Sequence, residues 1–137
     1  MDIEALIPHR PPFLWVDRIE SLEPGVRCVA SKFVAAGAPC FDGHFPGRPI
    51  LPGVFLVEAA AQAAGVMLAS AANSPRPESV MLAAVNFFKF VKPVLPDSTI
   101  EVEVRAGSRA GRLVHVAATI SVAGSRVAVG DLTVVGP

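Results

Sequence analysis

Apolar and polar residues alternate with a period of two through much of this chain, which is typical of half-buried β-strands. Between residues 99 and 105 every second residue is isoleucine or valine, and the alternation recurs over residues 114–122. A turn at residues 123–125 leads to a further strand at 126–135. Residues 13–20, 26–34 and 80–91 also have strand character, the first two separated by a turn at residues 23–25. The pattern therefore predicts about six strands, mostly in sequential hairpins.

One segment breaks this alternation. Residues 54–72 are almost continuously apolar and rich in alanine, which predicts a helix about 28 Å long. A loop dense in proline and glycine, residues 37–53, precedes the helix, and residues 73–77 end it in an exposed connection. A helix that is apolar on all sides needs a sheet around it. We expect one α+β domain over residues 1–137, with an antiparallel sheet wrapped around one long central helix. Dimerisation through an edge strand would bury the rest of the helix, so we expect a homodimer.

Composition narrows the function. The 137 residues include twelve basic and twelve acidic side chains and no basic cluster, so nothing predicts nucleic-acid binding. Glu58 and Gln62 interrupt the apolar helix, which argues against membrane insertion. Cys28 and Cys40 lack the spacing of a metal pair or redox motif, so we expect two buried thiols, no metal and no cofactor. The N-terminus lacks the pattern of a signal peptide, and we expect a cytoplasmic protein.

His44 is the first candidate for chemistry. It lies between glycine and phenylalanine in the constrained loop, where apolar surroundings would favour the neutral ring that a general base needs. A histidine that only satisfies a loop hydrogen bond is the alternative.

Glu58 is the second candidate, because a carboxyl inside an apolar helix is unusual. Burial tends to keep such a group protonated, as a general acid requires. A surface-facing carboxylate is the alternative. Gln62 lies four residues on, where it could orient Glu58 or simply face solvent.

Gly53 begins the predicted helix, where free N–H groups and the positive end of the helix dipole can stabilise an enolate oxygen. Helix initiation by the Pro52-Gly53 pair is the simpler interpretation. A base, an acid and an oxyanion donor together are what β-elimination from a thioester requires.

The segment HFPGRPILPGV followed by EAAAQAAG closely resembles the signature of the (3R)-hydroxyacyl-[acyl-carrier-protein] dehydratases of the FabZ type. Residues 7–14 and 16–18 resemble that family's N-terminal motif, and residues 90–96 match it weakly. The resemblance implies a hot-dog fold and a hydro-lyase acting on 3-hydroxyacyl thioesters of acyl carrier protein in fatty-acid or related polyketide or polyene biosynthesis. It assigns His44 as base, Glu58 as acid and Gly53 as N–H donor to the thioester carbonyl.

The resemblance also implies an assembly. His44 and Glu58 of one active site would come from different subunits of a homodimer, and some members form a trimer of dimers. Phe45, Val54, Phe55 and Phe87 are candidate walls of the acyl tunnel, although core packing is the simpler explanation for each. Gln62 is grouped with Gly53, Phe45 and Val54 as a substrate-binding candidate. Because carrier proteins are acidic, the basic candidates for docking are Arg10, Arg48, Arg76, Lys89 and Lys92.

Several departures from the family pattern concern specificity. The chain has no tyrosine, whereas some members use one to gate the tunnel. Asn86 and Lys89 stand where Asp and Arg are usual, and Pro96-Asp97-Ser98 replaces a Pro-Gly-Asp turn. These changes suggest a specialised pathway. Two alternatives stay open: a hot-dog acyl thioesterase, and a non-catalytic acyl-thioester binding partner that would need no His44 and Glu58 together.

Overall fold

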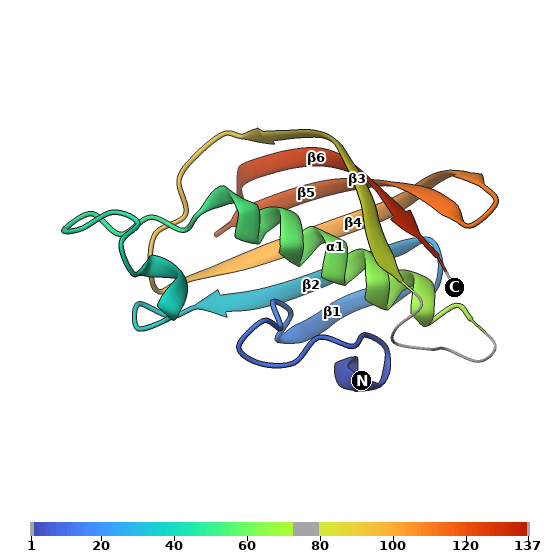
Figure 1. Ribbon diagram of the computed structural model, residues 1–137, viewed down its shortest axis with the longest axis horizontal. Helices are drawn as coiled ribbons and strands as arrows, with labels where there is room; N and C mark the ends of the chain where they lie inside the picture. Colours follow the sequence, from blue (N-terminus) through green and yellow to red (C-terminus); the bar gives the residue numbers. More distant parts are fainter. Residues whose placement is uncertain (1, 73–79, 137) are drawn as a thin grey trace.

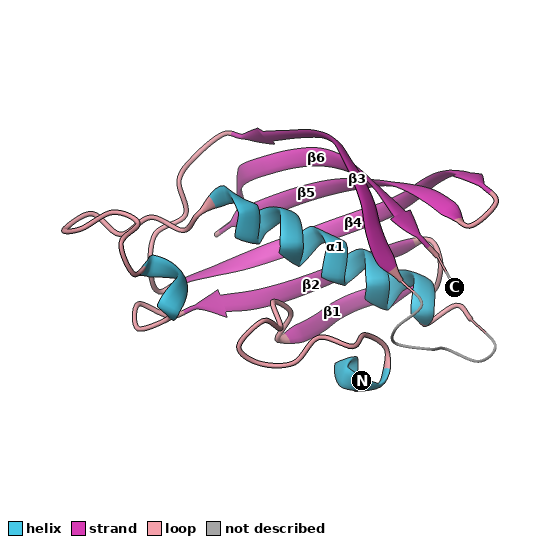
Figure 2. Cartoon of the chain, viewed as in Figure 1, coloured by secondary structure: helices cyan, strands magenta, loops and turns pink. Residues whose placement is uncertain are grey.

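A single antiparallel sheet surrounds one helix in the computed structural model, which describes residues 2–72 and 80–136. The strand order is β1-β2-β4-β5-β6-β3. The helix α1 (Gly53–Ala69) lies across one face of the sheet (Figure 1). The strands are β1 (Arg18–Glu23), β2 (Arg27–Val34), β3 (Met81–Phe90), β4 (Ser98–Ala110), β5 (Leu113–Val122) and β6 (Ser125–Val135), and two short 3-10 turns, η1 (Ile3–Ala5) and η2 (Pro39–Phe41), complete the order (Figure 2). The predicted α+β architecture is confirmed, and the connection expected at residues 73–77 lies outside the described residues.

The core forms where the alternating strands face the helix. Val102 pairs with Ile120 and Val104 with Ala118 across β4 and β5, and all four side chains are at most 3% exposed. The helix contributes small residues on most of its sides, including Ala59, Ala60, Ala63 and Ala64, which are fully buried. These alanines let the sheet approach the helix closely, which explains why an apolar alanine-rich helix can lie inside a curved sheet.

The first strand begins later than its sequence pattern predicts. We expected a strand over residues 13–20, but β1 starts at Arg18. The N–H of Trp15 donates to the side-chain oxygen of Gln62, and the carbonyl of Phe13 accepts from the Gln62 amide. A helix side chain therefore takes the backbone groups that a neighbouring strand would have used. The local pattern of apolar and polar residues cannot predict such hydrogen bonds between residues far apart in the sequence.

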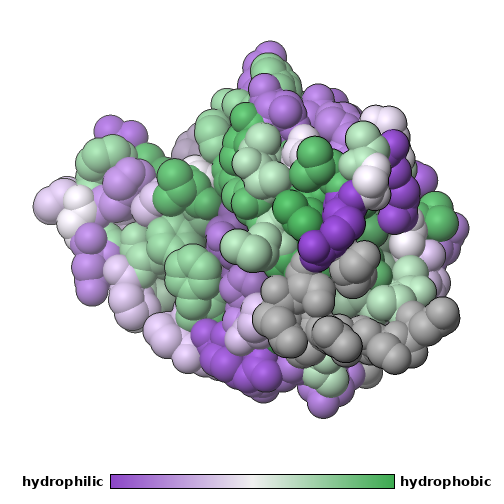
Figure 3. Space-filling model, turned by 45° about the vertical axis from the view of Figure 1, so that its right-hand side comes forward, coloured by the Kyte–Doolittle hydropathy of each residue, from purple (hydrophilic) through white to green (hydrophobic). Residues whose placement is uncertain are grey.

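The two edges of the sheet differ in character. Strand β1 presents Arg18, Glu20 and Glu23 at its edge, which is the usual protection against further strand pairing. Strand β3, at the other edge, carries exposed apolar side chains. Met81, Leu82, Val85, Phe87 and Phe90 are each between 40% and 67% exposed. Hydrophobic surface gathers in a broad group on one side of the molecule (Figure 3). An apolar edge strand of this kind indicates an interaction surface.

None of the described helices is long and apolar enough to cross a membrane.

The two cysteines differ in burial. Cys28 is fully buried, and this burial raises the pKa of its thiol to about 11. Cys40 is only partly buried, contrary to the expectation of two buried thiols, although burial raises its pKa as well. Because the thiolate is the reactive form, Ellman's reagent should modify Cys40 slowly in the native protein and Cys28 only after unfolding. In Cys40→Ser no native thiol should react within the same period, and a fast-reacting native thiol in that variant would contradict the burial of Cys28.

Candidate active site

His44 lies on a loop that projects from the body of the molecule ahead of α1 (Figure 1). The loop closes on itself through paired backbone hydrogen bonds between Phe45 and Arg48, and the Ile50 N–H donates to the His44 carbonyl. The Nδ1 atom of His44 is 2.8 Å from the carbonyl oxygen of Ile50. A carbonyl only accepts, so Nδ1 carries a hydrogen, and in the neutral ring the lone pair is then on Nε2. The loop therefore holds His44 in the tautomer that a general base requires.

The Phe45 ring stacks on His44, with ring centroids 4.2 Å apart. His44 itself is half-buried, whereas Phe45 is 52% exposed. The apolar surroundings expected for His44 are thus only partly supplied by this chain.

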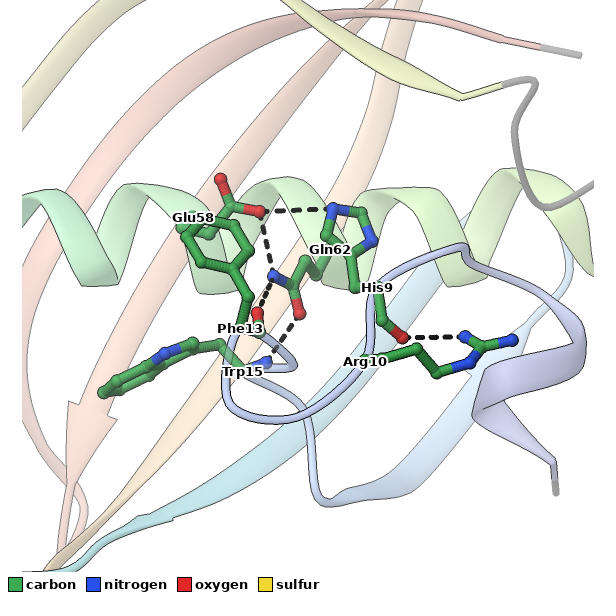
Figure 4. A network of polar contacts seen from close by, with 6 residues as sticks. All are labelled: His9, Arg10, Phe13, Trp15, Glu58 and Gln62. Atoms are coloured by element: carbon green, nitrogen blue, oxygen red, sulfur yellow. Dashed lines mark hydrogen bonds and ion pairs between the residues drawn. The ribbon is translucent and has the colours of Figure 1, made fainter. Parts of the chain in front are cut away.

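Glu58 is held by a network that joins α1 to the N-terminal loop (Figure 4). The Nε2 atom of Gln62 donates to Oε2 of Glu58 over 2.8 Å and to the carbonyl of Phe13 over 2.9 Å. The side-chain oxygen of Gln62 accepts from the N–H of Trp15 over 2.7 Å. Gln62 is 1% exposed, so its amide is fully used inside the protein. Of the two positions considered for Gln62, the one that orients Glu58 is observed, and these contacts give no support to direct substrate binding.

Replacing Gln62 with leucine should destabilise the protein by roughly 3 kcal/mol, because the buried N–H of Trp15 and the partly buried carbonyl of Phe13 would lose their hydrogen-bond partner. Thermal unfolding and urea titration measure this change. The same variant should lose activity, since Oε2 of Glu58 would lose the hydrogen bond from the Gln62 amide. Gln62→Glu is a useful comparison, because it keeps the side-chain length and an acceptor for Trp15 but places a second carboxyl beside Glu58. Wild-type stability in Gln62→Leu would contradict the network.

Gly53 begins α1, as predicted, with Pro52 as its N-cap. The first N–H groups of a helix have no partner within it, so they are available to a ligand. The structure also gives a second reason for glycine at this position. A Cβ atom built on Gly53 would lie 2.8 Å from Cε1 of Phe90, closer than real Cβ contacts allow. The Phe90 ring therefore packs directly against the start of the helix.

We expect Gly53→Ala to displace the Phe90 ring and lower kcat/KM about ten-fold, because the wall beside the helix N-terminus would move. Steady-state kinetics with the wild-type protein as reference measure the loss. Adding Phe90→Leu to Gly53→Ala should restore much of the activity by relieving the overlap. If the double variant is no more active than Gly53→Ala, the loss of activity comes from a displaced backbone N–H group and not from the displaced Phe90 ring.

The remaining site candidates fall into two separate pockets of the chain. The His44 pocket, about 430 Å³, is lined by His44, Gly53, Val54, Phe90 and Lys92 among others. The Glu58 pocket, about 320 Å³, includes Glu58, His9, Gly65, Met81 and Leu82. His44 and Glu58 are thus not brought together in one pocket of the described chain.

The candidate tunnel walls are distributed across the molecule. Val54 lines the His44 pocket and is 70% exposed. Phe55 packs on Trp15, with ring centroids 4.8 Å apart, and Phe87 is exposed on β3. Packing accounts for Phe55, whereas the exposure of Val54 and Phe87 is not explained by the core of one chain.

His9 is a site residue that the sequence pattern did not single out. It lines the Glu58 pocket, and its Nε2 atom is 3.4 Å from Oε2 of Glu58. It lies in a proline-rich segment without periodicity, where patterning gives no signal. Its place within a motif that resembles a family signature was the available clue.

Residues 2–72 and 80–136 contain no group of three histidine, cysteine or acidic side chains placed to hold a metal ion.

Comparison with known proteins gives a consistent result. The profile described as "FabA-like domain" matches residues 7–131. The 3-hydroxyacyl-[acyl-carrier-protein] dehydratase FabZ of Herpetosiphon aurantiacus is 44% identical over 135 residues, covering 96% of this chain and 92% of that protein. The protein of the same name from an Anaeromyxobacter species is 41% identical over 140 residues, covering 96% and 87%. Among solved structures, the dehydratase heterocomplex ApeI:P from Xenorhabdus doucetiae superposes with a TM-score of 0.84 at 18% identity, covering 100% of this chain and 91% of that one, which supports the fold.

Proposed function

Because this chain belongs to the FabA-like family of FabZ-type 3-hydroxyacyl-[acyl-carrier-protein] dehydratases, we propose that His44 and Glu58 are the acid–base pair of that reaction here. The chain is a hydro-lyase that converts 3-hydroxyacyl thioesters of acyl carrier protein to trans-2-enoyl thioesters in fatty-acid biosynthesis. The observation that carries the pair is the contact of His44 Nδ1 with the Ile50 carbonyl at 2.8 Å, which directs Nε2 away from the loop backbone.

His44 starts the reaction by removing the proton at C2 with Nε2. The electron pair of the C2–H bond moves toward the carbonyl, where the free N–H at the start of α1 stabilises the enolate oxygen. The Ile50 carbonyl accepts a stronger hydrogen bond from Nδ1–H as the ring becomes an imidazolium. The loop thus supports the charge that the base acquires.

Glu58 completes the elimination. The C2–C3 double bond forms, the C3–O bond breaks, and Glu58 gives its proton to the departing oxygen, which leaves as water. Glu58 is then a carboxylate and His44 an imidazolium, so one proton returns from the base to the acid before the next turnover. The Gln62 amide on Oε2 stabilises the carboxylate that remains.

A homodimer built on β3 would bring the two pockets together. Phe90, at one end of β3, lines the His44 pocket, and Met81, at the other end, lines the Glu58 pocket. If two copies of β3 pair antiparallel about a two-fold axis near Val85, the Phe90 end of one lies beside the Met81 end of the other. The His44 pocket of each subunit would then meet the Glu58 pocket of its partner.

The side chains on β3 support this arrangement. Leu82, Val85 and Phe90 pair with the buried residues Val134, Leu132 and Ala128 of β6, so they point to the helix side of the sheet. They remain 40% to 49% exposed because the helix of the same chain covers them only in part. A second subunit would complete this core. Further assembly into a trimer of dimers stays a prediction.

Docking of the acidic carrier protein is the role we propose for exposed basic residues near the His44 pocket. Lys92 lines that pocket, and Arg48 is exposed on the His44 loop. Arg10 is instead engaged by Glu4 and by backbone carbonyls, and Arg76 lies outside the described residues.

Two free cysteines, Cys28 and Cys40, support the reducing cytoplasm as the place of the reaction.

A 3-hydroxyacyl thioester on a phosphopantetheine carrier tests the function directly. Dehydration produces enoyl absorbance without free thiol, and adding water to the enoyl product gives the reverse signal. A thioesterase would release thiol without enoyl absorbance, and a binding protein would produce neither signal. Either of these results with the purified wild-type dimer would refute the dehydratase assignment.

A further inference from the structure

His9 faces the Glu58 carboxyl from the N-terminal loop. Its Nε2 atom is 3.4 Å from Oε2 of Glu58, and its ring is stacked on Phe13 with an angle of 15° between the planes. Nδ1, on the other side of the ring, is buried and has no hydrogen-bond partner among the described residues. A buried nitrogen without a partner is unfavourable. The orientation of the ring is therefore set by Glu58 and Phe13, and not by any contact of Nδ1.

The backbone around His9 is anchored on both sides. The Arg10 guanidinium donates to the carbonyls of Ile7, His9 and Glu4 over 3.0, 2.7 and 2.9 Å. Its Nε also lies 2.9 Å from a carboxylate oxygen of Glu4. Further along the loop, Gln62 holds two backbone groups through its amide. The loop thus presents the His9 ring to Glu58 as part of a fixed structure.

We propose that His9 is a positioning residue which, with Gln62, holds Oε2 of Glu58, so that Oε1 carries the proton delivered to the leaving hydroxyl. Both neighbours approach the same oxygen, and the other oxygen points away from them (Figure 4). This inference rests on the proposed function, in which Glu58 is the acid.

The chemistry explains why donors on Oε2 matter. When Oε1 gives up its proton to the departing oxygen, the C3–O bond breaks, water forms, and negative charge spreads over both carboxylate oxygens. Donors on Oε2, including an Nε2–H of His9, interact more strongly with that charge than with the protonated acid. They therefore stabilise the transition state more than the bound substrate. Loss of His9 should consequently lower kcat and leave KM nearly unchanged.

Two variants separate the donor from the ring. His9→Phe keeps an aromatic ring beside Phe13 but removes the donor, and we expect kcat about ten-fold below wild type with KM within about two-fold. His9→Gln supplies an amide donor and should restore most of the loss. The matched control is His115→Phe, at another histidine–carboxylate pair, where Nε2 lies 3.8 Å from Asp131 on the sheet. That variant should keep wild-type kcat.

Trp15 is the only tryptophan of the chain and lies in the same loop, so its emission reports whether the loop stays in place. The inference is overturned if His9→Phe keeps wild-type kcat, if His9→Gln restores nothing, or if the loss of kcat accompanies a changed Trp15 emission, which would show that His9 merely holds the loop. An inactive wild-type dimer would refute the proposed function and this inference together. An active wild type that depends on His44 and Glu58 but not on His9 would refute this inference alone.

Discussion

Replacing His44 with alanine, or Glu58 with glutamine, should lower the rate of dehydration about a thousand-fold, because each change removes one of the two proton-transfer groups. Enoyl absorbance from a 3-hydroxyacyl thioester measures the loss. Both variants should remain folded dimers, since neither side chain is part of the buried core. Substantial activity in either purified variant would refute the assignment of the pair.

Mixing the two inactive variants gives the sharper result. If each site takes His44 from one subunit and Glu58 from the other, a heterodimer of the two variants contains one intact site and one doubly altered site. Random exchange of subunits should then restore about a quarter of wild-type activity. Each variant unfolded and refolded alone is the control, and it should stay inactive. A mixture that also stays inactive after proven subunit exchange would place both groups of a site in one chain.

Introducing a charge in the middle of β3 should dissociate the dimer and abolish activity. Val85 is 47% exposed on the helix side of the edge strand, where we propose that a second subunit packs. An arginine there would be buried without a partner, at a cost of several kcal/mol. Sedimentation or light scattering should show Val85→Arg with the 14.3 kDa mass of one chain, against about twice that mass for the wild type.

The opposite edge of the sheet supplies the matched control. Ser21 is exposed on β1, which already carries charged residues. Ser21→Arg should therefore leave both the mass in solution and the activity unchanged. A monomeric Ser21→Arg, or a dimeric and active Val85→Arg, would show that the subunits meet elsewhere.

The sequence pattern predicts most of the fold because the strands beside the helix bury one face only. Alternation at Ile100, Val102 and Val104 marks β4 correctly, although the strand continues to Ala110, where alternation fades. The helix begins at Gly53, as predicted, and ends at Ala69, three residues before the end of the apolar run. The error at the first strand has a different origin, because the hydrogen bonds of Phe13 and Trp15 go to Gln62, 47 and more residues away.

The site could be predicted only in part, for a similar reason. Glu58 stands out as a lone carboxyl in an apolar helix, and His44 as a histidine in a constrained loop. His9 does not stand out, because its contact with Glu58 depends on how the loop folds back over the helix. The proposed pairing of β3 with a second subunit likewise rests on exposed surface, and the pattern of one strand does not reveal which side remains uncovered.

The amide of Gln62 also couples catalysis to the order in which the chain is completed. Glu58 receives its hydrogen bond from a side chain that is itself fixed by Phe13 and Trp15. A partly folded chain that has formed its sheet and helix, but has not yet docked its first fifteen residues, would contain every catalytic group and still lack an oriented acid. If the first fifteen residues dock after the sheet and helix have formed, refolding followed by activity should lag behind refolding followed by the secondary structure.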